Sequence, residues 1–220
     1  MKSRALCVLL ALCATGLSGL SAEEDRLDAE RKYYENKLAG MEAVLGPMHD
    51  FVGHAVIPFD VGGAVDMYYF PQERGTALAT MELLRLEGDI PMRGKLGTYE
   101  LVAFTKENIG TPDFSKIERA LCGIFTVLGN YSAGAVLNPL ETCEIPDGEG
   151  KRCLVFDEYP SGGKLDSGGR RHGLLLVIQV HEDEMAFAMK YGTKALLRRL
   201  RDRGCYPFSD LDRKSVVSGR

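Results

Sequence analysis

The sequence lacks the features that most directly mark enzymes and metalloproteins. Its 220 residues contain no tryptophan and only four histidines. Neither a Cys-x-x-Cys nor a His-x-x-x-His spacing occurs, so the ligand patterns of structural zinc sites are missing. There is also no Gly-x-Ser-x-Gly and no Gly-x-x-x-x-Gly-Lys-Ser/Thr, which excludes the commonest nucleophile elbow and phosphate loop. We therefore expect no metal and no cofactor, and we do not expect an enzyme.

One acidic stretch, His181 to Glu184, needs a separate explanation because it follows a long apolar run directly. A metalloprotease helix requires His-Glu-x-x-His, so that both imidazoles share a face. Position 185 is methionine, and the motif fails. Acids in the first turn of a helix stabilise its exposed N–H groups and dipole by roughly 0.3–1 kcal/mol each. The stretch is therefore interpreted as the start of a helix.

The longest hydrophobic run lies at the N-terminus. Lys2 and Arg4 precede an apolar segment, residues 5–20, and small residues precede Glu23. This order is typical of a secretory signal, and the run is short for a membrane span. We predict a signal peptide at 1–22 and an exported protein, periplasmic or secreted, with no stable membrane span after cleavage. An uncleaved anchor and lipidation at Cys13 are the alternatives, although leucine precedes Cys13 where a small residue would be expected.

Charge of one sign does not dominate the chain. It has 27 Lys and Arg against 31 Asp and Glu, a net charge of −4. A mildly acidic protein without a long basic stripe is a poor nucleic-acid binder, so no nucleic-acid partner is predicted. The local exception is the basic run 198–203. It lies at a predicted helix C-terminus, where cations complement the dipole, and is interpreted as a solvated helix end.

Cysteine is scarce in the predicted mature chain. Four remain after residue 22, namely Cys122, Cys143, Cys153 and Cys205. An even number in an exported chain permits two disulfides in three connectivities. Cys143 and Cys153 flank a turn-rich stretch, and a bridge between them is possible if the strand register places them opposite each other. Cys122 lies in a predicted helix and fits a buried small hydrophobe.

Apolar periodicity predicts an α+β fold. Helices are expected at 23–45, 111–128 and 182–204, each with capping or terminating residues. Strands are expected at 54–60, 65–70, 98–106, 135–145, 152–159 and 174–180, whereas 76–84 fits a strand or a helix. Residues 161–173 are rich in glycine and charge and predict a flexible loop, with His172 solvated. Together these elements predict one domain with a mixed, mainly antiparallel sheet covered by about three helices.

The order and spacing of these segments resemble those of the Suppressor of fused (SUFU-like) domain over residues 45–216. The similar segments are VDMYYFPQERGTALATMEL, GTYELVAFTKEN, FSKIERALCGIFTVLGNY, HGLLLVIQVHEDEMAFAMKYGTKALLRRL and FSDLDRKSV. The sequence departs from the family pattern at TMELLRL, where Gly-Met-Ser is lost, and in its export signal. The resemblance divides the chain into a signal peptide at 1–22, a lead-in helix at 23–44 and a SUFU-like domain of bacterial type at 45–220.

The resemblance implies a non-enzymatic protein-binding module. Animal members of the family sequester a transcription factor, and many bacterial members are immunity proteins that neutralise a toxin. The implied partner of this chain is therefore a protein, for example a toxin, and its acidic charge favours a basic partner. Binding would use surface complementarity or strand addition at a sheet edge. No partner-contacting residue of the animal members is transferred to this sequence.

Two other hypotheses stay open at this point. The first is an exported hydrolase whose site is assembled from distant residues, with His49, His54 and Asp60 as the first candidates. The second is a structural envelope protein without a discrete ligand. The sequence predicts neither the binding face nor the oligomeric state.

Overall fold

The computed structural model describes residues 4–148, 150–159, 165–167 and 170–218, and its side chains are described for residues 23–148, 150–159 and 172–218. The strands are β1 (Val52–Gly53), β2 (Met67–Gln72), β3 (Gly75–Ala79), β4 (Tyr99–Thr105), β5 (Thr142–Asp147), β6 (Gly150–Glu158), β7 (Leu165–Ser167) and β8 (Arg170–Val180). The helices are α1 (Arg4–Leu45), α2 (Pro112–Ser132), α3 (Glu182–Tyr191) and α4 (Thr193–Asp202), with a 3₁₀ turn at Phe59–Val61.

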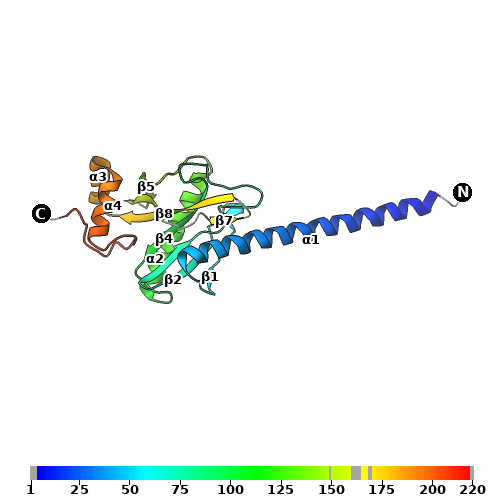
Figure 1. Cartoon of the computed structure of the whole chain (residues 1–220), viewed down its shortest axis with the longest axis horizontal. Helices are drawn as coiled ribbons and strands as arrows, with labels where there is room; N and C mark the ends of the chain where they lie inside the picture. Colours follow the sequence, from blue (N-terminus) through cyan, green and yellow to red (C-terminus); the bar gives the residue numbers. More distant parts are fainter. Residues whose placement is uncertain (1–3, 149, 160–164, 168–169, 219–220) are drawn as a thin grey trace.

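The strands form one mixed sheet in the order β1-β2-β3-β4-β8-β6-β5, with β7 also paired to β8 (Figure 1). The pairing between β4 and β8 is parallel. The other strand pairings described are antiparallel. The predicted α+β fold with a mixed, mainly antiparallel sheet is therefore confirmed.

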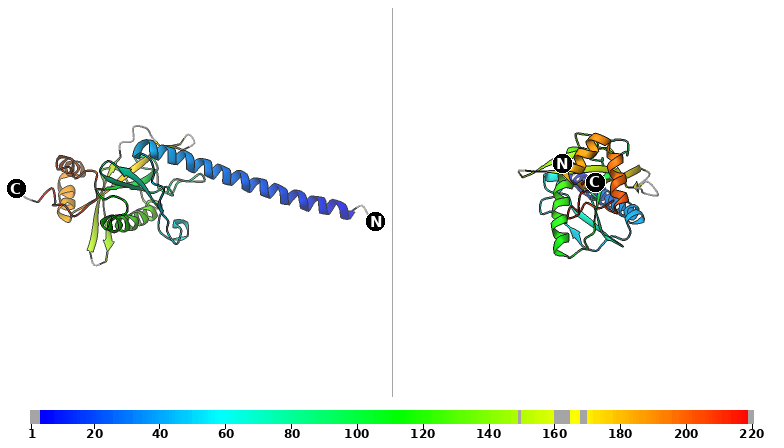
Figure 2. Two further views of the ribbon diagram at one scale, coloured as in Figure 1. Left: turned by 90° about the horizontal axis from the view of Figure 1, so that it is seen from below. Right: turned by 90° about the vertical axis from the view of Figure 1, so that its left-hand side faces the viewer.

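Helices cover both faces of the sheet (Figure 2). They bury two apolar clusters, one on each face. α2 covers one face with Phe114, Leu121 and Phe125. The C-terminal part of α1, together with α3 and α4, covers the other face. Alternate strand residues point to opposite faces. In β4, Leu101 therefore packs toward α2, and Val102 packs toward the face covered by α1.

α2 forms where the sequence predicts it. The Thr111 side chain accepts a hydrogen bond from the Phe114 N–H at 3.1 Å, and Pro112 occupies the first turn. Both features are standard helix starts. The helix continues to Ser132, a turn beyond the predicted end at residue 128.

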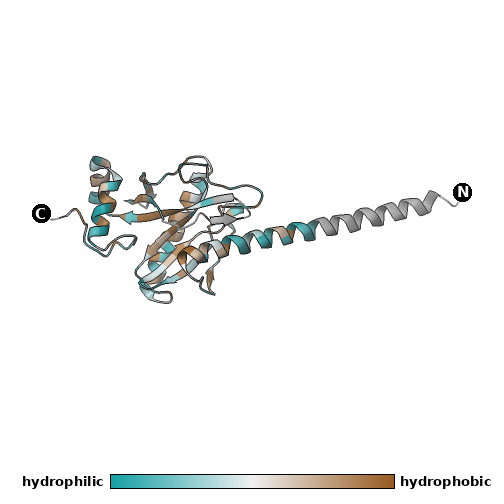
Figure 3. Ribbon diagram, viewed as in Figure 1, coloured by the Kyte–Doolittle hydropathy of each residue, from teal (hydrophilic) through white to brown (hydrophobic). Residues whose placement is uncertain are grey.

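α1 is one continuous helix that projects from the domain (Figures 1 and 3). The predicted helix over 23–45 is confirmed, and it ends before Gly46, whose φ is +84°. One face of the helix is buried from Tyr33 onward, with Met41 and Leu45 in the core. No helix among the described residues is long and apolar enough to cross a membrane. Cleavage after residue 22 stays a prediction, and Cys13 lies outside the described side chains.

Three predicted elements differ in the structure. The strand expected over 135–145 begins only at Thr142, as β5, and residues 135–141 form turns and irregular backbone. The helix expected over 182–204 is divided into α3 and α4 at Gly192, because φ +88° and ψ 143° at this residue interrupt the helical path. The split explains why four α-helices are described where about three are predicted. The strand expected over 54–60 is wrong. Pro58 begins a tight turn closed by hydrogen bonds from the Gly62 and Gly63 N–H groups.

The glycine-rich segment 161–173, predicted as a loop, contains strand residues. Residues 160–164 and 168–169 lie outside the described part, but β7 occupies 165–167 and β8 already begins at Arg170. His172 is therefore buried in β8, and the prediction of a solvated His172 is wrong. The cause is the parallel pairing with β4, in which the Gly173 N–H donates to the Thr98 carbonyl at 2.9 Å. In the ambiguous segment 76–84, the strand β3 ends at Ala79.

The register of β5 and β6 separates Cys143 from Cys153. Cys143 lies opposite Leu154, and Cys153 lies opposite Glu144. Directly paired residues share a face of the sheet, so the two cysteines point to opposite faces. All four described cysteines have free thiols. The condition for the Cys143–Cys153 disulfide is thus not met, and that prediction is corrected.

Candidate functional site

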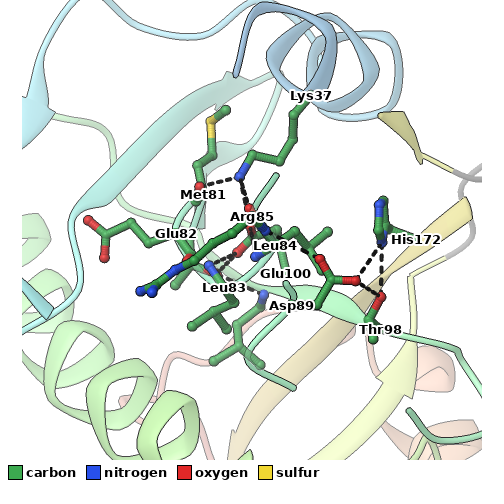
Figure 4. Close-up of polar contacts among 12 residues, drawn as sticks. Lys37, Met81, Glu82, Leu83, Leu84, Arg85, Asp89, Thr98, Glu100 and His172 are labelled. Carbon is green, nitrogen blue, oxygen red and sulfur yellow. Dashed lines mark hydrogen bonds and ion pairs between the residues drawn. The ribbon is translucent and has the colours of Figure 1, made fainter. Parts of the chain in front are cut away.

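A buried ion pair joins α1 to the central strand β4 (Figure 4). The Lys37 ammonium lies 3.2 Å from Glu100 Oε1 and 2.7 Å from the Leu84 carbonyl oxygen, and it also contacts the Met81 carbonyl. An ammonium group has three donors, and these three contacts use all of them. Lys37 is therefore a structural cation without capacity for a ligand.

Glu100 fixes the segment that follows β3. Its Oε2 accepts from the Thr80 hydroxyl at 2.7 Å and the Leu83 N–H at 3.3 Å. Its Oε1 accepts from the Leu84 N–H at 3.0 Å. A buried carboxylate is tolerated when such donors surround it. These contacts join α1, β4 and residues 80–84 into a rigid structural platform.

A second group of polar side chains lies next to this platform. The Thr98 hydroxyl is 2.8 Å from Asp89 Oδ2 and 2.9 Å from His172 Nδ1. Since an ionised carboxylate only accepts, the hydroxyl donates to Asp89 and accepts from His172. The imidazole thus carries its proton on Nδ1, and it links β8 to the loop before β4. Its role is to hold these elements together.

A cavity of about 470 Å³ opens next to the rigid platform. It is lined by α1 side chains between Arg26 and Lys37, by the turn 58–60 and by side chains of the segment 81–87. The lining cations already have partners. Arg26 binds Glu23 and Glu30, and Arg85 binds Asp60. The cavity is therefore a binding candidate by shape, built from three separated parts of the chain.

Glu82 is the most perturbed carboxyl group of this region. Its Oε1 accepts from the Asp66 N–H at 3.1 Å, and its buried Oε2 has no hydrogen-bond partner among the described residues. Burial, together with the nearby charges of Asp66 and Glu100, raises the pKa of Glu82 to about 7, although the Asp66 N–H and Lys37 oppose the shift. A proton on Glu82 therefore stabilises the fold below this pH.

Glu82→Gln is expected to stabilise the protein at pH 8 but not at pH 4. The raised pKa means that the folded state binds more protons than the unfolded state between about pH 4.5 and 7, so this group's contribution to stability falls as pH rises through that range. After allowance for partial exposure, the gain at pH 8 should be about 1–2 kcal/mol. Urea unfolding at both pH values measures it, and an equal effect at pH 4 and 8 would contradict the assignment.

The structure does not assemble the residues of the hydrolase alternative. His54 Nδ1 lies 2.7 Å from Asp66 Oδ2, His49 Nδ1 accepts from the Phe51 N–H, and Asp60 pairs with Arg85. In the part of the chain that the structure describes, no hydrogen bond or ion pair joins His49, His54 and Asp60 to one another. Each of the three residues is therefore held by a different partner.

The described thiols and possible metal ligands form no reactive site either. Burial raises the pKa of Cys122 and Cys143, which opposes the thiolate needed for nucleophilic attack. Among the described residues, no group of three or more His, Cys, Asp and Glu side chains is arranged to hold a metal ion.

An exposed apolar loop lies beside the cavity. Val56 is fully exposed, Val61 is 73% exposed and Ile57 is 58% exposed. Pro58 and Phe59 lie between Ile57 and Val61 in the sequence, and both line the cavity. Clustered exposed apolar side chains often mark interaction sites. Sequence reasoning missed this loop because it took 54–60 as a strand, although Pro58 and the following Gly62-Gly63 were signs of a turn.

Comparisons with known proteins give a fold but no sequence family. No protein-family model and no curated protein matches the chain. Among solved structures, the chain is similar to one described as the Sufu-Fu complex, with a TM-score of 0.57 and 17% identity, covering 82% of this chain and 89% of that one. Drosophila Suppressor of Fused gives a TM-score of 0.46 and 19% identity, covering 69% of this chain and 42% of that one.

The first of these similarities defines the class of fold. The mixed sheet with helices on both faces is that of an α+β domain. The chain has a SUFU-like fold, as the order of its segments predicted. The likeness is one of architecture, since the identity is low.

Proposed function

We propose that this chain is a non-enzymatic protein-binding module of the SUFU-like type. The observation that carries the proposal is the exposed apolar loop, with Val56, Ile57 and Val61, next to the 470 Å³ cavity. The similar solved structure is a complex of Sufu with Fu, which supports a protein as the class of partner.

The loop and the cavity supply different parts of the contact. Removing apolar side chains from water contributes roughly 25 cal/mol for each Å² buried, so Val56 and Ile57 supply affinity. The cavity receives a side chain of the partner and contributes shape complementarity. The platform formed by Lys37 and Glu100 holds residues 80–84 of the cavity wall in place, which limits the entropy lost on binding.

Strand addition to the sheet is the less favoured mode of binding. β5 forms one edge of the described sheet. It contains Pro146, which has no N–H donor, and the charged residues Glu144 and Asp147. Proline and charge are devices that protect an edge strand from pairing. Surface contact through the apolar loop is therefore preferred.

We further propose that the partner lies outside the cytoplasm, in the periplasm or beyond the cell. The basic, apolar and small-residue order of residues 1–22 supports export. A toxin neutralised by this chain is the specific partner that we propose, supported by the resemblance to bacterial immunity members. A toxin-like reading frame beside the gene would strengthen this assignment.

Substituting Val56, Ile57 and Val61 together by serine should weaken partner binding at least tenfold. A photo-crosslinking amino acid at position 56 first identifies the partner in the native host. The affinity of the purified pair is then measured with the original and the triple-serine chains. Leu211→Ser is the control, because Leu211 is exposed but is not part of the loop or the cavity lining. Equal crosslinking from positions 56 and 211, or unchanged affinity of the triple variant, would refute the proposed surface.

A further inference from the structure

The C-terminal helices carry a basic surface on an otherwise acidic chain. Between residues 193 and 203 there are five Lys or Arg residues and one acid, Asp202, whereas the whole chain has a net charge of −4. α3 and α4 lie on the side of the domain opposite to the projecting end of α1 (Figure 1). The cations are thus gathered at one end of the molecule.

Packing turns these cations toward solvent. Leu196, Leu197 and Leu200 of α4 are buried in the core. Lys194 and Arg198 lie on the exposed face, four residues apart, where helical side chains are neighbours. Neither side chain makes a hydrogen bond or ion pair among the described residues, in contrast to Arg201, which lies 2.6 Å from Asp157.

The helix dipole does not account for this arrangement. Cations are favourable in the last turn of a helix and unfavourable in the first. Arg199 and Arg201 occupy the last turn of α4, but Lys194 is in its first turn. Like charges at a spacing of four residues also repel each other. The pair Lys194 and Arg198 therefore costs stability in the isolated chain, and an anionic partner would remove that cost.

Aromatic rings on α3 complete the surface. The Arg199 guanidinium lies 4.4 Å from the centre of the Phe187 ring. The Lys190 ammonium lies 5.1 Å from the centre of the Tyr191 ring, and the Tyr191 side chain is 57% exposed. Such cation–π contacts hold long side chains in place. Arg199 is therefore oriented before any partner binds.

We propose that this basic surface, formed by Phe187, Lys190, Tyr191, Lys194, Arg198 and Arg199, binds an acidic segment of a protein partner. The guanidinium groups match carboxylates through paired hydrogen bonds. A lipid surface fits less well, because the leucines of α4 face the core and leave no apolar face to insert. A nucleic acid fits less well, since the rest of the chain is acidic. The proposal goes beyond the proposed function, because it names a second surface and a different contact chemistry.

The test uses the full chain and a fluorescent twelve-residue peptide of alternating Glu and Asp, with a Gln/Asn peptide for comparison. Saturable binding of the acidic peptide is expected, weakening steeply between 50 and 300 mM NaCl because the contacts are exposed. Lys194→Glu combined with Arg198→Glu should weaken it at least tenfold. Lys194→Gln with Arg198→Gln should give a smaller loss in the same direction.

The matched control is Arg31→Glu combined with Lys32→Glu, which makes the same change of charge on the exposed part of α1. Equal losses in both charge-reversed chains would overturn the proposal, as would no binding of the acidic peptide at 50 mM NaCl. Tighter binding to phosphatidylserine vesicles or to a twelve-nucleotide single strand would also overturn it. The triple-serine loop variant should bind the peptide normally, so failure here and failure of the apolar-loop proposal are distinguishable.

Discussion

Glu100→Gln is expected to lower the free energy of unfolding by about 3–5 kcal/mol. Glu100 is completely buried and accepts hydrogen bonds from Thr80, Leu83, Leu84 and Lys37. The substitution removes the charge but keeps the shape. It leaves the Lys37 ammonium inside the protein without its counter-ion, and an uncompensated buried charge is strongly destabilising.

Urea unfolding at pH 7 measures this effect, and Glu35→Gln on the exposed side of α1 is the control. The control should change stability by less than about 0.5 kcal/mol. Lys37→Met combined with Glu100→Gln should cost less than the sum of the two single substitutions, because the double variant leaves no lone buried charge. If Glu100→Gln behaved like the control, the ion pair would not hold α1 to the sheet.

Glu184→Gln is expected to cost about 3 kcal/mol and to release the C-terminal segment. Glu184 is buried in the first turn of α3 and accepts from the His181 N–H at 2.9 Å. It also forms a paired contact with Arg213, at 2.5 and 2.8 Å, and accepts from the Val216 N–H at 2.7 Å. One carboxylate thus caps a helix and fixes residues 213–216. Removing its charge leaves the buried Arg213 without its counter-ion.

The pH dependence follows from the same contacts. Burial alone would raise the pKa of Glu184, but Arg213 and the Val216 and His181 N–H groups lower it below its ordinary value of 4.5. Its stabilisation is therefore present above about pH 4.5 and is lost as the pH falls through the folded-state pKa. The stability difference between Glu184→Gln and the original chain should shrink between pH 6 and 2.5. Exposed Glu182→Gln is the control, and a pH-independent difference would contradict this role.

Local patterns predicted most of the scaffold. The alternation in residues 98–106 placed β4, and Thr111-Pro112 placed the start of α2. The acids after His181 predicted a helix start, which the structure confirms. The helix break at Gly192 and the turn at Pro58 were missed because the apolar spacing continues across both. The regular backbone conformation is nevertheless interrupted at these residues. His172 was missed because its burial depends on a parallel partner strand.

The candidate site was not predictable in the same way. Lys37 and Glu100 lie 63 residues apart in the sequence, and a single chain contains too many acids and bases to pair them by type. The apolar loop was predicted as a strand because Val56 and Ile57 have the composition of a strand. Only the fold shows that these side chains face water.

The parallel pairing of β4 and β8 has a consequence for synthesis on the ribosome. β1 to β4 form an antiparallel meander from nearby residues, but β4 residues 99–102 find their partners only at residues 173–176. Until those residues emerge, the buried, apolar strand β4 is an open edge, and such edges pair readily with other chains. Expression at lower temperature or with chaperones that shield nascent chains should therefore raise the soluble yield.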